Sequence, residues 1–194
     1  MIENESSDSR HEFTDTQLPE SMTPERILEP SAERAATRIE AWYPLLEPRL
    51  AKCLTDPNVV LTLSDARART ETYFKEPEPG DESEFHKLSL VSEADGIRFE
   101  TSRIPGKSTL MINIENLAGY KNVSETTRLP GIPTFDPAES WEGVRKWQEA
   151  SVAGVNAAAE RGEYPAEIRN EKKDRHTVLG VMKGYPDAAI ISMI

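Results

Sequence analysis

The sequence is poor in the residues that bind metals or form disulfides. It has one cysteine, Cys53, and three histidines that lie far apart in the chain, namely His11, His86 and His176. A single cysteine forms no disulfide within its own chain, and no pair of these histidines has the spacing of a zinc motif. We therefore expect no metal and no other cofactor. Because Cys53 falls on an apolar stripe, we interpret it as a small buried core residue rather than a reactive thiol.

Long apolar runs are also missing. No run of apolar residues approaches the roughly 20 that a membrane-spanning helix needs. The first eight residues, MIENESSD, have neither the basic region nor the apolar core of a signal peptide. These absences predict a cytoplasmic protein that does not act at a membrane.

The chain lacks a complete nucleotide-binding loop. Residues 106–109, Gly-Lys-Ser-Thr, match the end of a phosphate-binding loop, in which a first glycine stands five residues before the second. Here Thr101 occupies that position, and the residues from Leu110 onward have the pattern of a strand instead of the required helix. We interpret residues 106–109 as a turn and expect no nucleotide cofactor.

An excess of basic residues is absent as well. The net charge is −11, and all of the excess falls in residues 1–30, with eight acidic and two basic residues, and in residues 61–100, with ten and five. Direct nucleic-acid binding is not expected, because the one basic cluster, residues 172–175, is interrupted by Asp174. We predict that residues 1–22 form a disordered acidic tail. An acidic inhibitor or nucleic-acid mimic remains an alternative function.

The apolar pattern predicts an N-terminal helix. A short helical turn is expected at Thr23-Pro24, and Ser31 is the expected cap of the first long helix. Apolar residues then recur at steps of three and four through this segment, at Ile39, Trp42, Tyr43, Leu46, Leu50, Cys53 and Leu54. Pro44 and Pro48 are expected to kink or divide the helix.

The middle of the chain predicts strands. Residues 59–64 are rich in β-formers, and the strand pattern is expected to continue toward Tyr73 and Phe74. Asp95-Gly96 is a favoured hairpin turn, which would pair residues 86–94 with residues 97–105. In that register His86 and Arg103 share a face with Leu88, Leu90 and Phe99. A further strand over residues 110–115 would place Leu110, Ile112 and Ile114 on one face.

The last third predicts helices. Residues 116–135 are interpreted as a long connection, and Asp136-Pro137 as the start of a helix that ends at Gly162. Two further helices are expected over about 165–183 and 187–194. The predicted fold is thus one α+β domain, residues 23–194, in which an antiparallel meander of three or four strands carries an N-terminal helix and a C-terminal helical segment packed on one face.

The absence of catalytic motifs favours a protein-interaction or accessory module that binds a protein partner or a second copy of itself. Its candidate partner-binding residues are Trp147 and Gly154, on a helix face rich in small residues, and Ile191 and Ile194 at the apolar C-terminus. The main alternative is a small enzyme or a domain that binds an anion or small molecule at the sheet face. Its candidate residues are His86 and Arg103, a titratable ring and a cation at the rim of an apolar face.

Overall fold

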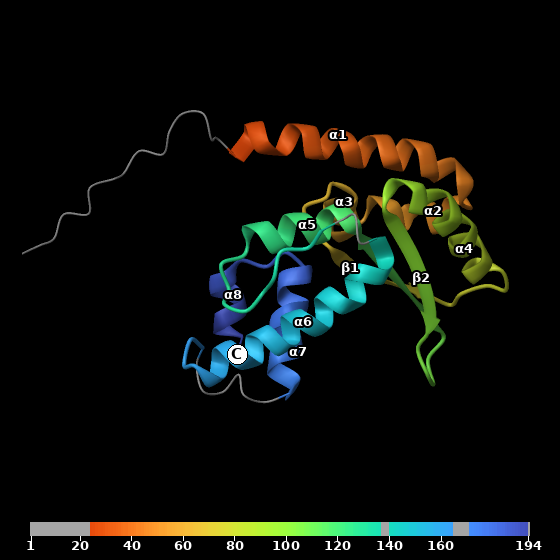
Figure 1. Cartoon of the computed structure of the whole chain (residues 1–194). Coiled ribbons are helices and arrows are strands. Elements are labelled where there is room, and N and C mark those ends of the chain that lie inside the picture. The colour runs from red at the N-terminus through yellow and green to blue at the C-terminus, as the bar shows by residue number, and fades with distance from the viewer. Residues whose placement is uncertain (1–23, 137–139, 165–170, 194) are drawn as a thin grey trace, which may run out of the picture.

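The computed structural model describes residues 24–136, 140–164 and 171–193, which form an α+β fold around one antiparallel sheet (Figure 1). The strands are β1 (Arg69–Lys75), β2 (Ile97–Arg103) and β3 (Thr109–Asn116). The α-helices are α1 (Pro24–Trp42), α2 (Pro48–Ala51), α3 (Pro57–Leu63), α4 (Asp81–Ser92), α5 (Leu117–Thr126), α6 (Ser140–Glu160), α7 (Glu171–Met182) and α8 (Asp187–Ser192). The predicted α+β class and the three-stranded sheet are confirmed. The predicted tail, residues 1–22, lies outside the described residues.

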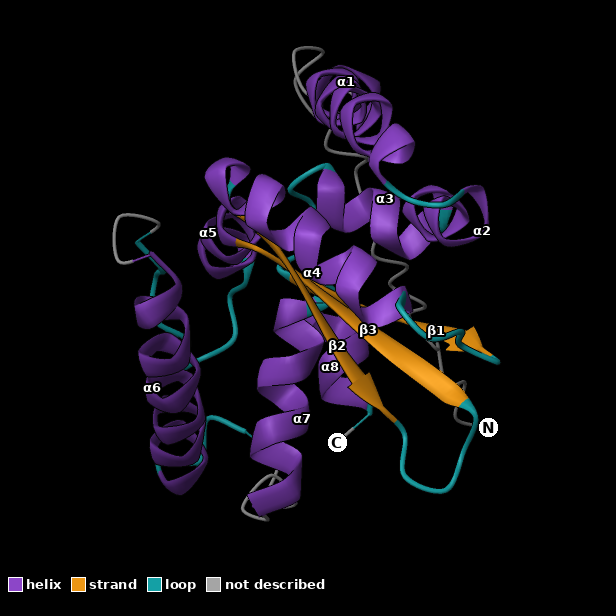
Figure 2. Ribbon diagram, turned by 90° about the vertical axis from the view of Figure 1, so that its right-hand side faces the viewer, coloured by secondary structure: helices purple, strands orange, loops and turns teal. Residues whose placement is uncertain are grey.

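The strand order in the sheet is β1-β3-β2, with β3 antiparallel to both neighbours. Only β2 and β3 are neighbours in both sequence and sheet, because α4 carries the chain from β1 past the position of β3 to β2. The order therefore differs from that of a simple meander. Figure 2 shows the three strands running diagonally across the molecule.

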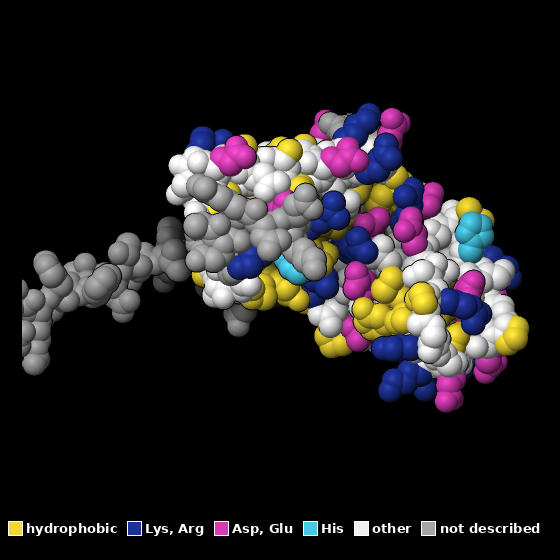
Figure 3. All heavy atoms as spheres, turned by 90° about the horizontal axis from the view of Figure 1, so that it is seen from below, with side chains coloured by type: hydrophobic (Ala, Val, Ile, Leu, Met, Phe, Trp, Pro, Cys, Tyr) yellow, Lys and Arg dark blue, Asp and Glu magenta, His cyan; other side chains and the backbone are white. Residues whose placement is uncertain are grey.

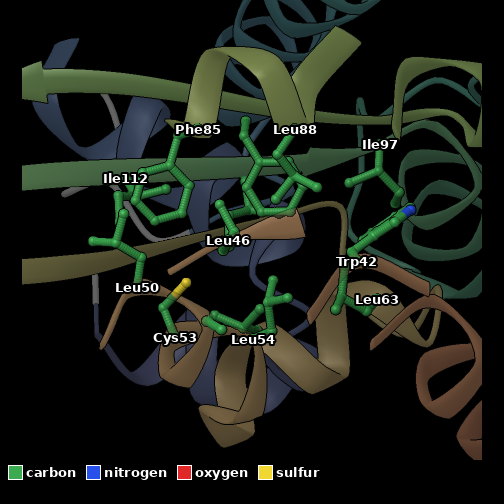
Figure 4. Close-up of a cluster of buried hydrophobic side chains, with 14 of the residues drawn as sticks. Trp42, Leu46, Leu50, Cys53, Leu54, Leu63, Phe85, Leu88, Ile97 and Ile112 are labelled. Atoms are coloured by element: carbon green, nitrogen blue, oxygen red, sulfur yellow. The ribbon is translucent and has the colours of Figure 1, made fainter. Parts of the chain in front are cut away.

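One face of the sheet is apolar and packs against α1 to α4. Leu110, Ile112 and Ile114 are fully buried on this face, as the sequence predicts. Figure 4 shows Phe85 and Leu88 of α4 directed toward side chains from the N-terminal helices. This first cluster consists of Ala35, Trp42, Leu46, Leu50, Ala51, Cys53, Leu54, Val59, Leu63, Phe85, Leu88, Ile97, Phe99, Leu110, Ile112 and Ile114.

The N-terminal helices differ from the prediction in two places. Helix α1 runs unbroken from Pro24 to Trp42, so Ser31 lies inside it and caps nothing. Residues 59–64 are not a strand, since they lie in α3 and at its end. Asp56 caps α3 by accepting a hydrogen bond from the Asn58 N–H, and Pro57 occupies the first helical position. Pro44 and Pro48 do divide the segment, into a 3₁₀ turn at Tyr43–Leu45 and then α2.

The predicted hairpin across Asp95-Gly96 is wrong, because residues 81–92 form α4 instead of a strand. Phe85, Leu88 and Ser92 are buried at helical spacing, and α4 packs along β2. The hydroxyl of Ser89 accepts a hydrogen bond from the Phe99 N–H, and that of Ser92 donates one to the Ile97 carbonyl. These contacts replace the strand pairing that the sequence pattern suggests. Gly96 still makes the turn, with a positive φ of 71°.

The C-terminal helices build a second cluster. Residues 116–135 do not form one long connection, because α5 occupies residues 117–126. The side chain of Asn116 caps α5 by accepting a hydrogen bond from the Gly119 N–H. The predicted start of the next helix at residues 137–139 lies outside the described residues. The second cluster consists of Ala68, Tyr120, Val123, Leu129, Phe135, Val144, Trp147, Val155, Ala158, Ala159, Tyr164, Val178, Val181, Met182 and Ile190.

Candidate functional site

The structure does not place His86 and Arg103 on a shared sheet face. His86 is exposed on α4 and Arg103 is exposed at the end of β2, where its Nε lies 2.5 Å from a carboxylate oxygen of Glu82. The hairpin register that would have brought both onto one apolar face does not exist. The hypothesis of a site at these two residues loses its geometric basis.

Trp147 and Gly154 are occupied by contacts within the chain. Trp147 is 4% exposed, and its indole N–H donates a hydrogen bond of 2.7 Å to the carbonyl of Pro133. A Cβ at Gly154 would lie 1.9 Å from the carbonyl oxygen of Gly131. Gly154 does allow another segment to pack closely against α6. That segment is the loop of residues 127–135. The Trp147 ring therefore packs within the second cluster.

The C-terminal helix leaves apolar side chains at the surface. Ile191 and Met193 of the α8 region and Tyr185 before it are exposed. They lie at or next to a cavity of about 320 Å³ between α7 and α8, which is also lined by Lys173, His176 and Lys183. Ile194 lies outside the described residues. Of the predicted partner-binding residues, Ile191 is therefore the one that the structure places at the surface.

The most unusual feature of the sheet is its second face, which carries charges in rows across the strands. Arg69 of β1 and Arg98 of β2 flank Glu115 of β3. In the next row, Glu71 and Glu100 flank Asn113. Successive residues of a strand point to opposite faces, so these six side chains share the face turned away from the first cluster. Both central residues, Asn113 and Glu115, are 8% exposed.

A hydrogen-bonded chain connects this face to the C-terminal helices. The Tyr120 hydroxyl donates a hydrogen bond of 2.9 Å to Oε1 of Glu115 and accepts one of 3.0 Å from the side-chain amide of Gln148 on α6. Arg69 lies beside it, with Nη1 4.0 Å from Oε1 of Glu115 and Nη2 3.2 Å from Glu71. On the other side, the Arg98 guanidinium carbon lies 4.3 Å from the centre of the Trp141 ring, in cation–π geometry.

Burial shifts the titration of two of these groups. Burial raises the pKa of Glu115, and the hydrogen bond from Tyr120 and the charge of Arg69 offset this rise only in part. Burial also raises the pKa of Tyr120 well above its ordinary value, with the charge of Glu115 acting in the same direction. Tyr120 therefore remains a hydrogen-bond donor to Glu115 over the physiological pH range.

A cavity of about 280 Å³ lies over these rows, between the sheet and α6, and we call it the sheet cavity. Its polar lining includes Arg69, Arg98, Glu100, Asn113, Glu115 and Gln148. A second cavity of about 630 Å³ between α6 and α7 shares Arg69 and Gln148 with it. Seen from below, acidic and basic side chains lie beside hydrophobic ones on this face of the molecule (Figure 3). Such convergence of polar groups on a cavity is typical of ligand sites.

Two polar atoms at the sheet cavity make no hydrogen bond within the described part of the chain. They are Nε of Arg69, a donor, and Oδ1 of Asn113, an acceptor, and both are buried. Buried polar groups are nearly always hydrogen-bonded, since an unpaired one costs about 1–3 kcal/mol. The lining thus offers one unpaired donor and one unpaired acceptor. Across residues 24–136, 140–164 and 171–193, no group of three or more His, Cys, Asp or Glu side chains is placed to hold a metal ion.

The sequence analysis missed this site, although a signal for it exists. Charged or amide side chains recur two residues apart in each strand, at Arg69 and Glu71, at Arg98 and Glu100, and at Asn113 and Glu115. Such alternation marks a polar strand face. The pattern does not reveal that the three pairs face one another or that helices partly cover them.

Comparison with known proteins gives no further guide, since no family model, curated protein or solved structure matches the chain. In the part of the chain that the structure describes, no helix is long and apolar enough to cross a membrane.

Proposed function

We propose that this protein binds a small polar molecule in the sheet cavity. The observation that carries the proposal is the pair of buried, unpaired polar atoms, Nε of Arg69 and Oδ1 of Asn113, on residues that line one cavity. A ligand that hydrogen-bonds both atoms would remove the cost of leaving them unpaired. The proposal assigns binding and no reaction.

The surroundings support a built site. Arg98 is held against Trp141, so this wall of the cavity is fixed by a contact of its own, and Gln148 donates a hydrogen bond to Tyr120. Glu115 has a raised pKa in the same cavity, and shifted titration of this kind is more frequent at functional sites than elsewhere. Trp141 and Val144 add an apolar wall that a ligand's carbon atoms can contact.

Both unpaired atoms are covered by neighbouring groups in this structure. The proposal therefore includes a rotation of a lining side chain when the ligand binds, a change that is common at binding sites. Gln148 is the candidate, since it lines both cavities and its side chain is only partly buried. The cytoplasmic location remains part of the proposal, because the one cysteine is free and buried and needs no oxidising compartment.

The test is an NMR titration of the labelled full chain with four probes: L-alanine, propionate, ethylammonium and inorganic phosphate. We expect at least one probe to shift the Trp141 indole and Gln148 amide signals in a saturable way. Asn113→Leu removes the unpaired acceptor and should abolish the shifts. Ser102→Ala, one row further out on the same face and exposed, should leave them unchanged. If none of the four probes shifts these signals, the proposal is wrong.

A second candidate function is binding of a protein partner at the groove between α7 and α8. It is favoured by the exposed side chains of Tyr185 and Met193, which line this groove, and of Ile191, which follows the lining residue Ile190. Lys173, His176 and Lys183 line the same groove, so we propose an acidic amphipathic segment of another protein as its occupant.

This candidate is tested by fluorescence anisotropy with an amphipathic helical peptide that has glutamates on its polar face. Met193→Asp should weaken binding at least tenfold, since Met193 is exposed and lines the groove. Leu90→Asp changes an exposed apolar residue on the distant helix α4 and should not weaken binding. Equal binding of a peptide with lysines in place of glutamates would contradict it. An acidic mimic has less support, because the acidic residues of the sheet face stand beside arginines.

A further inference from the structure

We infer that the ligand of the sheet cavity is a small zwitterion, a molecule with a carboxylate and a protonated amine close together, as in an amino acid. The inference rests on the proposed function and names the ligand class of that same site. It follows from where the unpaired donor and the unpaired acceptor lie, and from which charges flank each of them.

The anionic end of the ligand is assigned to Arg69. Its Nη2 contacts Glu71 and its Nη1 faces Glu115, but its Nε has no hydrogen-bond partner among the residues that the structure describes. An incoming carboxylate oxygen can accept a hydrogen bond from Nε without displacing either glutamate. Arginine is well suited to this contact, because its guanidinium presents several donors in one plane. Arg98 and Arg145 line the same cavity and add positive charge.

The cationic end is assigned to Asn113 and Glu100. Oδ1 of Asn113 is a buried acceptor with no donor in the described ranges of the chain, so an N–H or O–H group of the ligand would pair with it. Glu71 and Glu100 flank Asn113 on the neighbouring strands. Glu100 lines the cavity, and its side chain is more than half exposed, so its carboxylate can turn toward a ligand. An ammonium group satisfies both the acceptor and this negative charge.

The positions assigned to the anionic and cationic ends of the ligand lie side by side in the cavity. Glu115 and Asn113 are two residues apart on β3, so their rows are separated by about 7 Å along the strand. Arg69 and Asn113 line a single cavity of about 280 Å³, which admits a molecule of amino-acid size. Trp141 and Val144 would contact the ligand's carbon side chain.

A ligand with only one of the two charges would fit the sheet cavity less well than a zwitterion. A simple anion would pair with Arg69 but leave Oδ1 of Asn113 unfilled and lie near Glu100. A simple cation would satisfy Asn113 but leave the buried Nε of Arg69 without an acceptor. A zwitterion fills both positions and adds no net charge to a lining that already mixes arginines and glutamates.

The experiment compares three probes of matched shape by NMR titration of the full chain. L-alanine carries both groups, propionate lacks the amine and ethylammonium lacks the carboxylate. We expect L-alanine to saturate the Trp141 indole shift at a concentration at least tenfold below that of either single-charge probe. Arg69→Lys keeps the positive charge but removes the Nε donor, and should weaken L-alanine and propionate at least fivefold.

Glu100→Gln tests the other end and should weaken L-alanine and ethylammonium but not propionate. Glu142→Gln is the matched control, since Glu142 is exposed on α6 next to Trp141 and pairs with Lys146. Circular dichroism checks that each variant is folded. If propionate or ethylammonium binds as tightly as L-alanine, the ligand class is wrong while the cavity still binds ligands. If inorganic phosphate binds but none of these three probes does, only the ligand class is wrong. If phosphate also fails to bind, the proposed function fails and this inference with it.

Discussion

Tyr120 donates a hydrogen bond of 2.9 Å to the carboxylate of Glu115 and thereby joins the second hydrophobic cluster to the polar face of the sheet. The ring of Tyr120 lies 5.5 Å from the rings of both Phe135 and Trp147. The same residue is thus a core aromatic and the donor to a buried carboxylate. The pair makes the stability of the fold depend on pH in a predictable direction.

The stability of Glu115→Gln relative to the wild-type protein should increase as the pH rises. Because the folded pKa of Glu115 is raised, the folded chain retains this proton at pH values where the unfolded chain has lost it. The stability that Glu115 contributes is fully present below the unfolded pKa, about 4.3, and declines as the pH rises through the folded pKa. Glutamine keeps an acceptor for Tyr120 but does not titrate. Urea unfolding of both proteins from pH 4 to pH 8 measures the difference.

Tyr120→Phe provides the contrasting variant. It removes the donor to Glu115 and the acceptor for Gln148, and should cost about 1–3 kcal/mol at neutral pH. It should also steepen the decline in stability with pH, because the hydrogen bond that lowers the pKa of Glu115 is gone. A Glu115→Gln protein whose stability follows the wild-type pH profile would contradict the burial of this carboxylate.

Asp81→Asn should change the pH dependence of stability in the direction opposite to that of Glu115→Gln. Asp81 accepts hydrogen bonds of 2.6 and 3.1 Å from Arg49 and one of 2.8 Å from the Glu78 N–H. Burial alone would raise the pKa of Asp81, but these hydrogen bonds outweigh it and lower the pKa. The stability from Asp81 is thus present above its unfolded pKa and is lost as the pH falls through its folded pKa.

We expect Asp81→Asn to lose about 2 kcal/mol at pH 7 and much less at pH 2.5, measured by urea unfolding. Glu78→Gln is the control. The Glu78 carboxylate also pairs with Arg49, but at 3.5 Å and with its side chain exposed to solvent. It should change stability little at either pH. Equal losses for Asp81→Asn at both pH values would show that its contribution does not come from its charge.

Leu88→Ala and Leu90→Ala distinguish a helix from a strand over residues 81–92. In a strand both leucines would share the buried face, whereas in α4 Leu88 is 1% exposed and Leu90 is 66% exposed. Leu88→Ala should therefore cost about 2–5 kcal/mol, and Leu90→Ala about 0.5 kcal/mol or less. Thermal or urea unfolding measures both. Similar losses for the two variants would favour the strand.

Gly154→Ala should destabilise the fold despite the higher helix propensity of alanine. The propensity gain is about 1 kcal/mol, but the new Cβ would meet the backbone carbonyl of Gly131, which cannot move without shifting the loop. Gly180→Ala on α7 is the matched control, because its Cβ would meet only the side chain of Ile190. We expect a clearly lower melting temperature for Gly154→Ala than for Gly180→Ala. The reverse order would mean that the loop does not pack on α6.

The sequence predicts secondary structure and burial correctly where one local pattern dominates. The alternation of Leu110, Ile112 and Ile114 correctly predicts β3 and its buried face. It was a poor guide where β-forming residues occur in helices, as at Val59 and Val60 in α3, because the Asp56 cap and packing against the sheet outweigh their propensity. In α4, two of the buried positions are serines, which hides the helical stripe.

The candidate site could be predicted only in part. Polar alternation in each strand is visible in the sequence, but the rows that unite Arg69, Glu115 and Arg98 depend on pairing between segments far apart in the chain. The position of α6 over these rows depends on tertiary packing. A local pattern contains neither kind of information. The sequence analysis therefore places its candidates, His86 and Arg103, on the apolar face with Phe99, whereas the candidate site lies on the opposite face of the sheet.

The strand order has a consequence for synthesis of the protein. Because β3 lies between β1 and β2, every sheet partner of the two outer strands is in residues 109–116. A nascent chain that has left the ribosome only as far as Arg103 has no strand with which to pair. At that stage Ile97 and Phe99 have no contact with β3, although most residues of the first cluster have already been synthesised. The middle strand is the last to arrive, so residues 24–103 cannot complete this sheet during translation.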